Sequence, residues 1–222
     1  MSEFEDFLSY GGDLEEEEGD ASVLLSIGDM MSGLLLIFAL LFITVLVQLK
    51  EREEPIRVVI GTVLEELQGN NIDVDVNKET GDISLSESIL FDENSAELKP
   101  EGKAFLQRFI PVYSGVIFSR PLFEQEITRV VIEGHTSSKG DYETNLNLSA
   151  RRSLSVAEYI FSDEINFPTE NKLKNKIATS ARGEIEARQD IDDPKDRKVT
   201  FRFQFRGQEV LRTLGKNTSL EE

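Results

Sequence analysis

The longest apolar stretch of the chain lies close to its N-terminus. Residues Ala21 to Leu49 contain one ionisable side chain, and Leu34 to Val47 is apolar except for Thr44. A bilayer core about 30 Å thick is crossed by about 20 mostly apolar helical residues, so this stretch is long enough. A cleaved signal peptide would have a basic start and a small-residue cleavage site. Here the preceding residues are acidic and no Ala-x-Ala pattern occurs before Gln48, so we predict an uncleaved transmembrane helix.

After this stretch, the pattern of apolar residues switches between helical and strand periods. Apolar residues from Ile56 to Leu67 recur at helical spacing, and Gly69-Asn70 is expected to end that helix. The predicted elements are the helices Glu51–Gln68, Pro100–Tyr113 and Asn145–Phe161, the hairpin strands Ile72–Val76 and Ile83–Leu85, and the strands Ile127–Ile132, Lys176–Thr179 and Lys198–Phe205. This order predicts an α+β fold in which helices pack on one face of a mixed sheet.

Charge is spread unevenly along the chain. The 222 residues have a net charge of −18, and residues 1–20 contain no Lys or Arg. We therefore predict an acidic tail (1–20), a transmembrane helix (21–49), a linker helix (50–71), an α+β domain (72–206) and a C-terminal tail (207–222). Nucleic acid is excluded as a partner because its phosphates require a basic surface.

The apolar stretch contains one carboxylate, Asp29. A charged side chain within a membrane helix costs about 3 kcal/mol on insertion scales, and such residues often mark ion pathways. Ser22, Ser26, Asp29 and Gly33 follow one another at helical spacing and so form a single stripe of small and polar residues. Small residues allow another helix to approach closely. The alternative is that Asp29 lies at the membrane interface as a helix-end charge.

Three runs in the domain resemble the signature of OmpA-like peptidoglycan-binding domains. The opening is ILFDENSAELKPEGKAFL at residues 89–106, and DRKV at 196–199 resembles the closing N-R-R-V. The core pattern is G-H-T-D followed by N-x-x-L-S-x-x-R, which IEGHTSSKGDYETNLNLSARRSLSVAEYI resembles at residues 132–160. The resemblance implies that peptidoglycan is bound by Thr136, Ser137, Asn145, Leu148 and Arg152.

Ser137 departs from this family pattern. In the family, the Asp of G-H-T-D and the helix Arg grip the diamino acid of the peptidoglycan stem peptide, and Arg152 matches that Arg. Ser137 stands where the family has Asp, which removes the anionic partner of the ligand's ammonium group. Asp141 or Glu143 is expected to compensate from the loop.

Helical spacing assigns two faces to the helix of the core signature. Asn145, Leu148 and Arg152 share one face, which we expect to present the ligand site. The alternative for Arg152 is a solvated helix Arg with a partner one turn away. A second face is expected to pack on the sheet and contains Ala150, Leu154, Ala157 and Phe161.

Two further expectations concern the loop of the signature. His135, the one histidine of the chain, is expected to brace the loop by hydrogen bonding rather than to bind metal. Gly134 and Gly140 are expected to serve tight turns. The chain has no Cys and one His, which excludes disulfides and Cys-based zinc sites and disfavours a His-rich metal centre. We predict no metal site and no cofactor.

An apolar helix with one Asp, followed by an OmpA-like domain, resembles the B subunits of MotB-type stator motors. The run SIGDMMSGLL at residues 26–35 is similar to the ion-carrying segment of that family, which implies that Asp29 carries the ion, with Ser26 and Ser32 beside it. The short connection between helix and domain is more like ZorB, the B subunit of Zorya anti-phage motors, than like flagellar MotB.

The resemblance also implies partners and a location. The implied complex is a ring of roughly five multi-span MotA/ZorA-like A subunits around a homodimer of this chain, bound to peptidoglycan in the bacterial inner membrane. The acidic tail (1–20) would then be cytoplasmic and the domain periplasmic, although Lys50, Arg52 and Arg57 follow the helix and positive charge normally stays in the cytoplasm.

Two other classes of protein are weighed against the stator. A static tether between membrane and wall would not need Asp29. An enzyme acting on peptidoglycan is disfavoured because the chain has no Cys, no His-x-x-Glu metal motif and no phosphate-binding Gly-rich loop, and no carboxylate pair stands out.

Overall fold

The computed structural model describes the backbone of residues 2–206 and the side chains of residues 26–48 and 56–206. The predicted tail 207–222 lies outside the described residues, as do the side chains of the acidic segment 1–20 and of Ser22. The chain forms two compact units, Met1–Glu53 and Glu54–Glu222. Helix α1 (Ser2–Gly69) contributes residues to both units.

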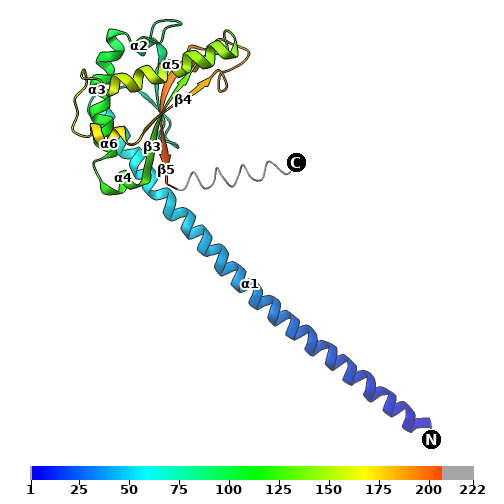
Figure 1. The fold of residues 1–222 in the computed structure, drawn as a ribbon. Coiled ribbons are helices and arrows are strands. Elements are labelled where there is room, and N and C mark those ends of the chain that lie inside the picture. The colour runs from blue at the N-terminus through cyan, green and yellow to red at the C-terminus, as the bar shows by residue number, and fades with distance from the viewer. Residues whose placement is uncertain (1, 207–222) are drawn as a thin grey trace. The chain divides into compact units, whose positions relative to one another are not determined.

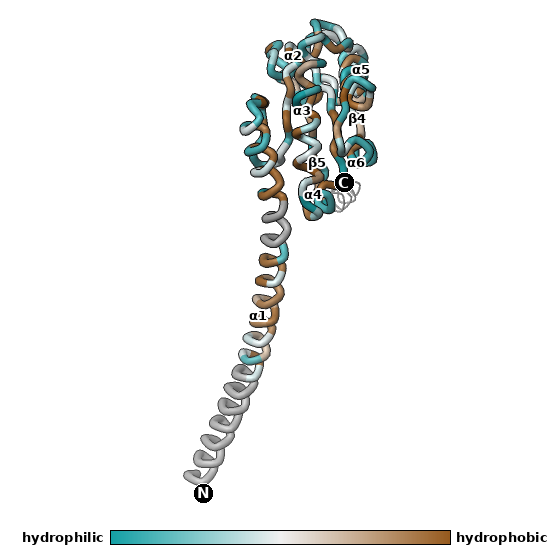
Figure 2. Tube along the Cα trace, turned by 90° about the vertical axis from the view of Figure 1, so that its left-hand side faces the viewer, coloured by the Kyte–Doolittle hydropathy of each residue, from teal (hydrophilic) through white to brown (hydrophobic). Residues whose placement is uncertain are grey.

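The first unit contains the apolar part of α1, visible as the brown stretch of that helix in Figure 2. Ser26–Gln48 is long and apolar enough to cross a membrane, and it is the one helical segment with that property among the described residues. None of this 23-residue segment is buried within the chain. A helix that is apolar and unburied along its whole length has the character of a membrane span.

The second unit is built on a five-stranded sheet with the strand order β1-β2-β5-β3-β4. The strands β3 and β4 pair in parallel, and every other neighbouring pair is antiparallel, so the sheet is mixed as predicted. The strands are β1 (Asp75–Val76), β2 (Ile83–Ser86), β3 (Ile127–His135), β4 (Ile177–Gly183) and β5 (Lys198–Phe205).

Helices α3 and α5 lie beside this sheet (Figure 1). The helices of the unit after α1 are α2 (Glu87–Leu90), α3 (Pro100–Ile117), α4 (Pro121–Glu126), α5 (Tyr142–Ile160), α6 (Glu170–Lys174) and the 3₁₀ turn η1 (Pro194–Asp196). Helix α5 connects the parallel strands β3 and β4, as a crossover between parallel strands requires.

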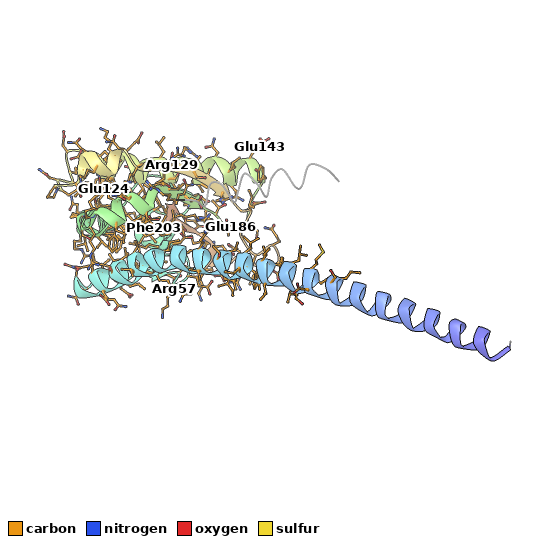
Figure 3. All side chains as sticks on the ribbon, turned by 90° about the horizontal axis from the view of Figure 1, so that it is seen from below. Arg57, Glu124, Arg129, Glu143, Glu186 and Phe203 are labelled. Atoms are coloured by element: carbon orange, nitrogen blue, oxygen red, sulfur yellow. The ribbon has the colours of Figure 1, made fainter. Side chains whose placement is uncertain are left out.

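The core lies between the helices and one face of the sheet. On β5 the alternate residues Val199, Phe201, Phe203 and Phe205 are buried. Phe201 meets Phe109 of α3 edge to face at 5.2 Å between ring centroids, and Phe203 stacks on Tyr113 at 5.5 Å. Figure 3 shows Phe203 within the domain. The last turns of α1 join the same core through Val59, Val63 and Leu67.

The other face of the sheet is polar. Arg202 of β5 pairs with Glu133 of β3 at 2.9 Å and with Asp82 at 3.2 Å. Arg182 of β4 lies 3.6 Å from the same Glu133 carboxylate. The ion pairs run across three neighbouring strands and supply the nearly buried Glu133 carboxylate with cationic partners.

Most predicted elements are present, with shifted ends. The strand predicted at Ile72–Val76 shortens to β1, whereas α3, β3 and β4 extend beyond their predicted C-terminal ends. The short helices α2, α4 and α6 were not predicted, because four to six residues are too few to show a helical period.

Candidate functional site

The faces of α5 are arranged differently from the prediction. Asn145, Leu148 and Arg152 are buried against the domain. Ala150 and Leu154 were expected to pack on the sheet, but both are exposed, Leu154 to 48%. The prediction of the packing face was therefore wrong for these two residues. It was right for the other two, because Ala157 is buried and Phe161 packs against the core. Helical spacing therefore placed the boundary between the two faces incorrectly.

Arg152 is enclosed by groups of its own chain. Its Nη2 donates to a Glu87 carboxylate oxygen, and its Nε donates to the Ser95 carbonyl at 2.9 Å. The guanidinium also lies over the Phe91 ring, 5.3 Å from its centroid. Burial lowers the pKa of Arg152, while the Glu87 carboxylate acts in the opposite direction. The alternative of a solvated Arg with a partner one turn away is thus also wrong.

Glu87 connects Arg152 to a second guanidinium. Its other carboxylate oxygen lies 2.9 Å from Nε of Arg197, and the Glu87 N–H donates to the Arg197 carbonyl. Arg197 in turn donates from Nη1 to Asp192 at 2.6 Å. We call the sequence Asp192, Arg197, Glu87 and Arg152 the charge row, because acidic and basic groups alternate along it. It runs from the loop before β5, past the start of α2, to the middle of α5.

Thr136 and Ser137 follow β3, and their loop is fastened to the loop that follows β4. The Thr136 N–H donates to the Gly183 carbonyl at 2.9 Å, and Ser138 Oγ donates to the Arg188 carbonyl at 2.8 Å. Ser137 hydrogen-bonds the Asp192 carboxylate. Both Thr136 and Ser137 are only 4% exposed. The structure thus brings Ser137 to one end of the charge row and Arg152 to the other.

Asn145 fixes both loops from α5. Its Nδ2 donates to the Lys139 carbonyl at 3.1 Å and to a carboxylate oxygen of Glu184. Asn145 is 5% exposed, so its contacts with the two loops take place inside the domain. Its observed role is to hold the loops together at the start of the helix.

The two glycines of the signature serve different purposes. Gly140 has φ +110° and lies in a turn, as predicted. Gly134 lies within β3 rather than in a turn, so that prediction was wrong. A Cβ on Gly134 would lie 2.0 Å from the Ser149 carbonyl oxygen, and Gly134 is therefore required by the close approach of α5 to the strand.

His135 is buried at the end of β3 and 2% exposed. Its Nε2 has no hydrogen-bond partner among the described residues, so the predicted hydrogen-bonded brace is not formed by this atom. Glu133 lies 3.9 Å from Nε2 and Glu186 lies 3.8 Å from Nδ1. Burial lowers the pKa of His135 to about 4, which Glu186 opposes and nearby cations reinforce. The imidazole is therefore neutral at pH 7.

Asp141 and Glu143 lie at the start of α5. Asp141 is its N-cap, because Oδ1 accepts from the Thr144 N–H at 2.9 Å. Hydrogen bonds with the side chain of Thr144 and with its backbone N–H lower the pKa of Asp141. Glu143 is exposed (Figure 3). The carboxylate that contacts Ser137 is instead Asp192, from a loop distant in sequence.

In the apolar segment of α1, Asp29 is exposed and pairs with no residue of the described chain. Ser32 Oγ donates to the Gly28 carbonyl at 2.8 Å, so its hydroxyl is satisfied within the helix. Gly28 and Gly33 have open space where a Cβ would be. Asp29 and Ser26 are thus on a helix with room for a close neighbour.

Sequence reasoning missed Glu87 and Asp192 as members of the site. Arg197 lies in the DRKV run, so its motif marked it without giving it a role. Glu87 and Asp192 carried no signal, since their partners lie 65 and 5 residues away and both are ordinary acids in an acidic chain.

The sequence of the second unit matches one protein family. Residues 90–200, half of the chain, match the OmpA family, and the chain therefore belongs to that family. Outer membrane protein A of Escherichia fergusonii is 33% identical over 87 residues, which cover 39% of this chain and 33% of the relative.

The similarity to one relative extends beyond the family domain. The Zorya protein ZorB of Escherichia coli is 28% identical over 219 residues, covering 86% of this chain and 92% of ZorB. Among solved structures, a MotB-like protein from Desulfovibrio vulgaris matches with a TM-score of 0.50 at 17% identity, over 72% of this chain and 96% of that protein. That last likeness shows the fold.

Proposed function

We propose that this chain is the B subunit of an ion-driven stator motor in the bacterial inner membrane, anchored to peptidoglycan and acting in anti-phage defence. The observation that carries the proposal is Asp29, a carboxylate inside an apolar segment of a chain that continues into an OmpA family domain. The similarity to ZorB along nearly the whole length of both chains supports the same class.

A charge in a membrane helix requires a compensating environment. The carboxylate of Asp29 has no partner in the described chain, and insertion of such a group costs about 3 kcal/mol. The space beside Gly28 and Gly33 allows a neighbouring helix to come close. We infer that multi-span A subunits surround this segment and that Asp29 faces an ion path between them.

The proposed mechanism follows from the titration of this carboxylate. Protonation removes the charge and with it the cost of placing Asp29 in apolar surroundings. A proton crossing the membrane releases about 2.3 kcal/mol per 100 mV of potential. Protonation and release on a pair of Asp29 residues would drive the A ring around the B subunits. Ser26 and Ser32 would line the path near the carboxylate.

The domain would supply the fixed point. Torque between the A and B subunits would rotate the whole complex unless one part is anchored, so the B subunits must be attached to the cell wall. We propose that the residues around Thr136, Ser137, Asn145, Leu148 and Arg152 form that hold on peptidoglycan. The domain is then periplasmic and residues 1–20 are cytoplasmic.

The test is to replace Asp29 by Asn in cells that carry this chain with its A subunit. Asn is nearly isosteric and cannot bind and release a proton, so the complex should still co-purify from membranes while protection against phage is abolished. Asp29→Glu keeps the carboxyl group and should retain part of the protection. Full protection by Asp29→Asn would overturn the ion-carrying role.

A static wall tether is the competing function. It predicts that the chain purifies from membranes alone or as a homodimer, with no ring of multi-span subunits. It also predicts that Asp29→Asn and the unsubstituted chain bind isolated sacculi equally well and give cells equal protection against phage.

A further inference from the structure

The members of the charge row differ in how far a ligand can reach them. The side chain of Arg152 is 2% exposed, and that of Glu87 is 10% exposed. At the other end, the side chains of Arg197 and Asp192 are 29% and 39% exposed. A ligand as large as a cell-wall peptide therefore meets Asp192 and Arg197 first.

Asp192 is held in place but keeps the capacity to accept more hydrogen bonds. It accepts from Ser137 and, at Oδ1, from Arg197. The hydrogen bond from Ser137 lowers the pKa of Asp192, and Arg197 acts in the same direction, so the carboxylate is ionised at pH 7. A carboxylate has room for more acceptor contacts than these, and an ammonium group is a suitable donor.

Arg197 is likewise fixed and only partly engaged. Its Nε is used by Glu87 and its Nη1 by Asp192, while a guanidinium has further N–H groups on Nη2. Arg197 also lines a groove of about 730 Å³ between the β1–β2 hairpin and the segment before β5. That volume is in the range of pockets that take small organic ligands.

We propose that Asp192 and Arg197 form the recognition pair for a zwitterionic amino-acid group. Asp192 takes the ammonium and Arg197 takes the carboxylate, as in the free end of a diamino acid in a peptidoglycan stem peptide. This inference rests on the proposed binding of peptidoglycan. It assigns the contacts with the ligand to Asp192 and Arg197 in place of Ser137 and Arg152.

Arg152 has a different role under this proposal. It is a positioning residue that holds Glu87, and Glu87 orients Arg197 through the 2.9 Å contact. Ser137 positions Asp192 in the same way from the opposite end. The residue that differs from the family pattern thus supports a carboxylate supplied by another loop.

The experiment uses the full-length chain in detergent and two soluble tripeptides, L-Ala-D-Glu-meso-diaminopimelate and the same peptide with its side-chain ammonium acetylated. Isothermal titration calorimetry gives both affinities, and sedimentation with sacculi gives wall binding. The unsubstituted chain should prefer the free ammonium about tenfold, the effect of one charge-assisted hydrogen bond at a partly exposed site. Asp192→Asn should bind the two peptides equally.

The matched control is Asp190→Asn, because Asp190 is an exposed acid of the same loop. It should keep the tenfold preference, and Asp192→Glu, which keeps the charge, should keep part of it. If Asp192→Asn keeps the same preference for the free ammonium as Asp190→Asn, and both still bind sacculi, the assignment is overturned but wall binding is not. The same holds if Asp192→Asn weakens both peptides by one factor, because that is a structural effect. Failure of the unsubstituted chain to bind sacculi overturns wall binding and, with it, this inference.

Discussion

Asp29 and Arg152 are both ionisable residues in a setting that disfavours charge, and the chain treats them in opposite ways. Arg152 is closed in by Glu87 and the Ser95 carbonyl, within the domain. Asp29 is exposed on an apolar helical segment and pairs with no described residue. The domain therefore supplies the counter-charge of its own buried arginine. The carboxylate of the apolar segment needs a compensating partner from outside the described chain. A charge without a partner in its own chain is the better indicator of an assembly.

The strongest way to break this comparison is to remove the partner of Arg152. Glu87→Gln leaves a guanidinium buried without a counter-charge, and we expect the free energy of unfolding to fall by about 3 to 5 kcal/mol. Urea unfolding followed by near-ultraviolet circular dichroism of the tyrosines and phenylalanines measures it.

The control for this prediction is Glu124→Gln. Glu124 pairs with Lys172 at 2.9 Å, but these side chains are 37% and 55% exposed. An exposed pair contributes about 0 to 1 kcal/mol, so this change should be small. Equal losses in the two variants would mean that the buried pair is no more important than a surface one.

His135 extends the comparison to pH. Its pKa in the folded domain is about 4, below the usual value of 6.5, so the unfolded chain binds the proton more readily. The stability due to neutral His135 is complete above pH 6.5 and is lost as the pH falls toward 4. The loss approaches about 3 kcal/mol, since one pKa unit corresponds to about 1.4 kcal/mol.

The measurement is urea unfolding at pH 7, 5.5 and 4 for the unsubstituted chain and for His135→Gln. The variant should show a flatter dependence, because the carboxylates titrate in both proteins and only the histidine differs. Parallel curves would show that His135 has an ordinary pKa in the folded domain.

Two glycines give the smallest effect and the sharpest contrast. Gly134→Ala places a methyl group against the Ser149 carbonyl and should cost about 1 to 3 kcal/mol of domain stability, measured by the same unfolding experiment. Gly33→Ala meets nothing within 4 Å in its own chain. It should leave domain stability unchanged and reduce co-purification with membrane partners.

The reverse pattern would contradict the comparison. A loss of domain stability in Gly33→Ala would indicate a contact within the chain, and tolerance of Gly134→Ala would indicate that α5 can move away from β3. Normal co-purification of Gly33→Ala would mean that no neighbouring helix comes close to that glycine.

The sequence predicted the mixed sheet, the apolar helical segment and the family of the domain, because each prediction rests on a pattern that extends over many residues. It did not predict the direction in which α5 turns. The apolar residues Ala150 and Leu154 are exposed, whereas the buried face carries Arg152, a residue type that is usually found at the surface. The burial of Arg152 depends on Glu87, which lies 65 residues away in the sequence, so it could be recognised only from the structure.

The same limit applies to Asp192. Asp141 and Glu143 are near Ser137 in sequence and were chosen for that reason. Asp141 instead caps α5 through Thr144, an interaction that its position before the helix could have indicated. Asp192 reaches Ser137 only because β4 and β5 are neighbours of β3 on its two sides, which brings the loops at the ends of these strands together.

The ends of the sheet suggest how such a chain avoids associating with itself in an unproductive way. β1 is only two residues long, and it covers one edge of the sheet. At the other edge β4 carries Arg182 and ends at Gly183, whose φ of +56° departs from extended geometry beside an irregular register with β3. A short strand, a charge and a bulge each discourage strand exchange between neighbouring molecules. Copies of this domain can thus be crowded together without their sheets joining into aggregates.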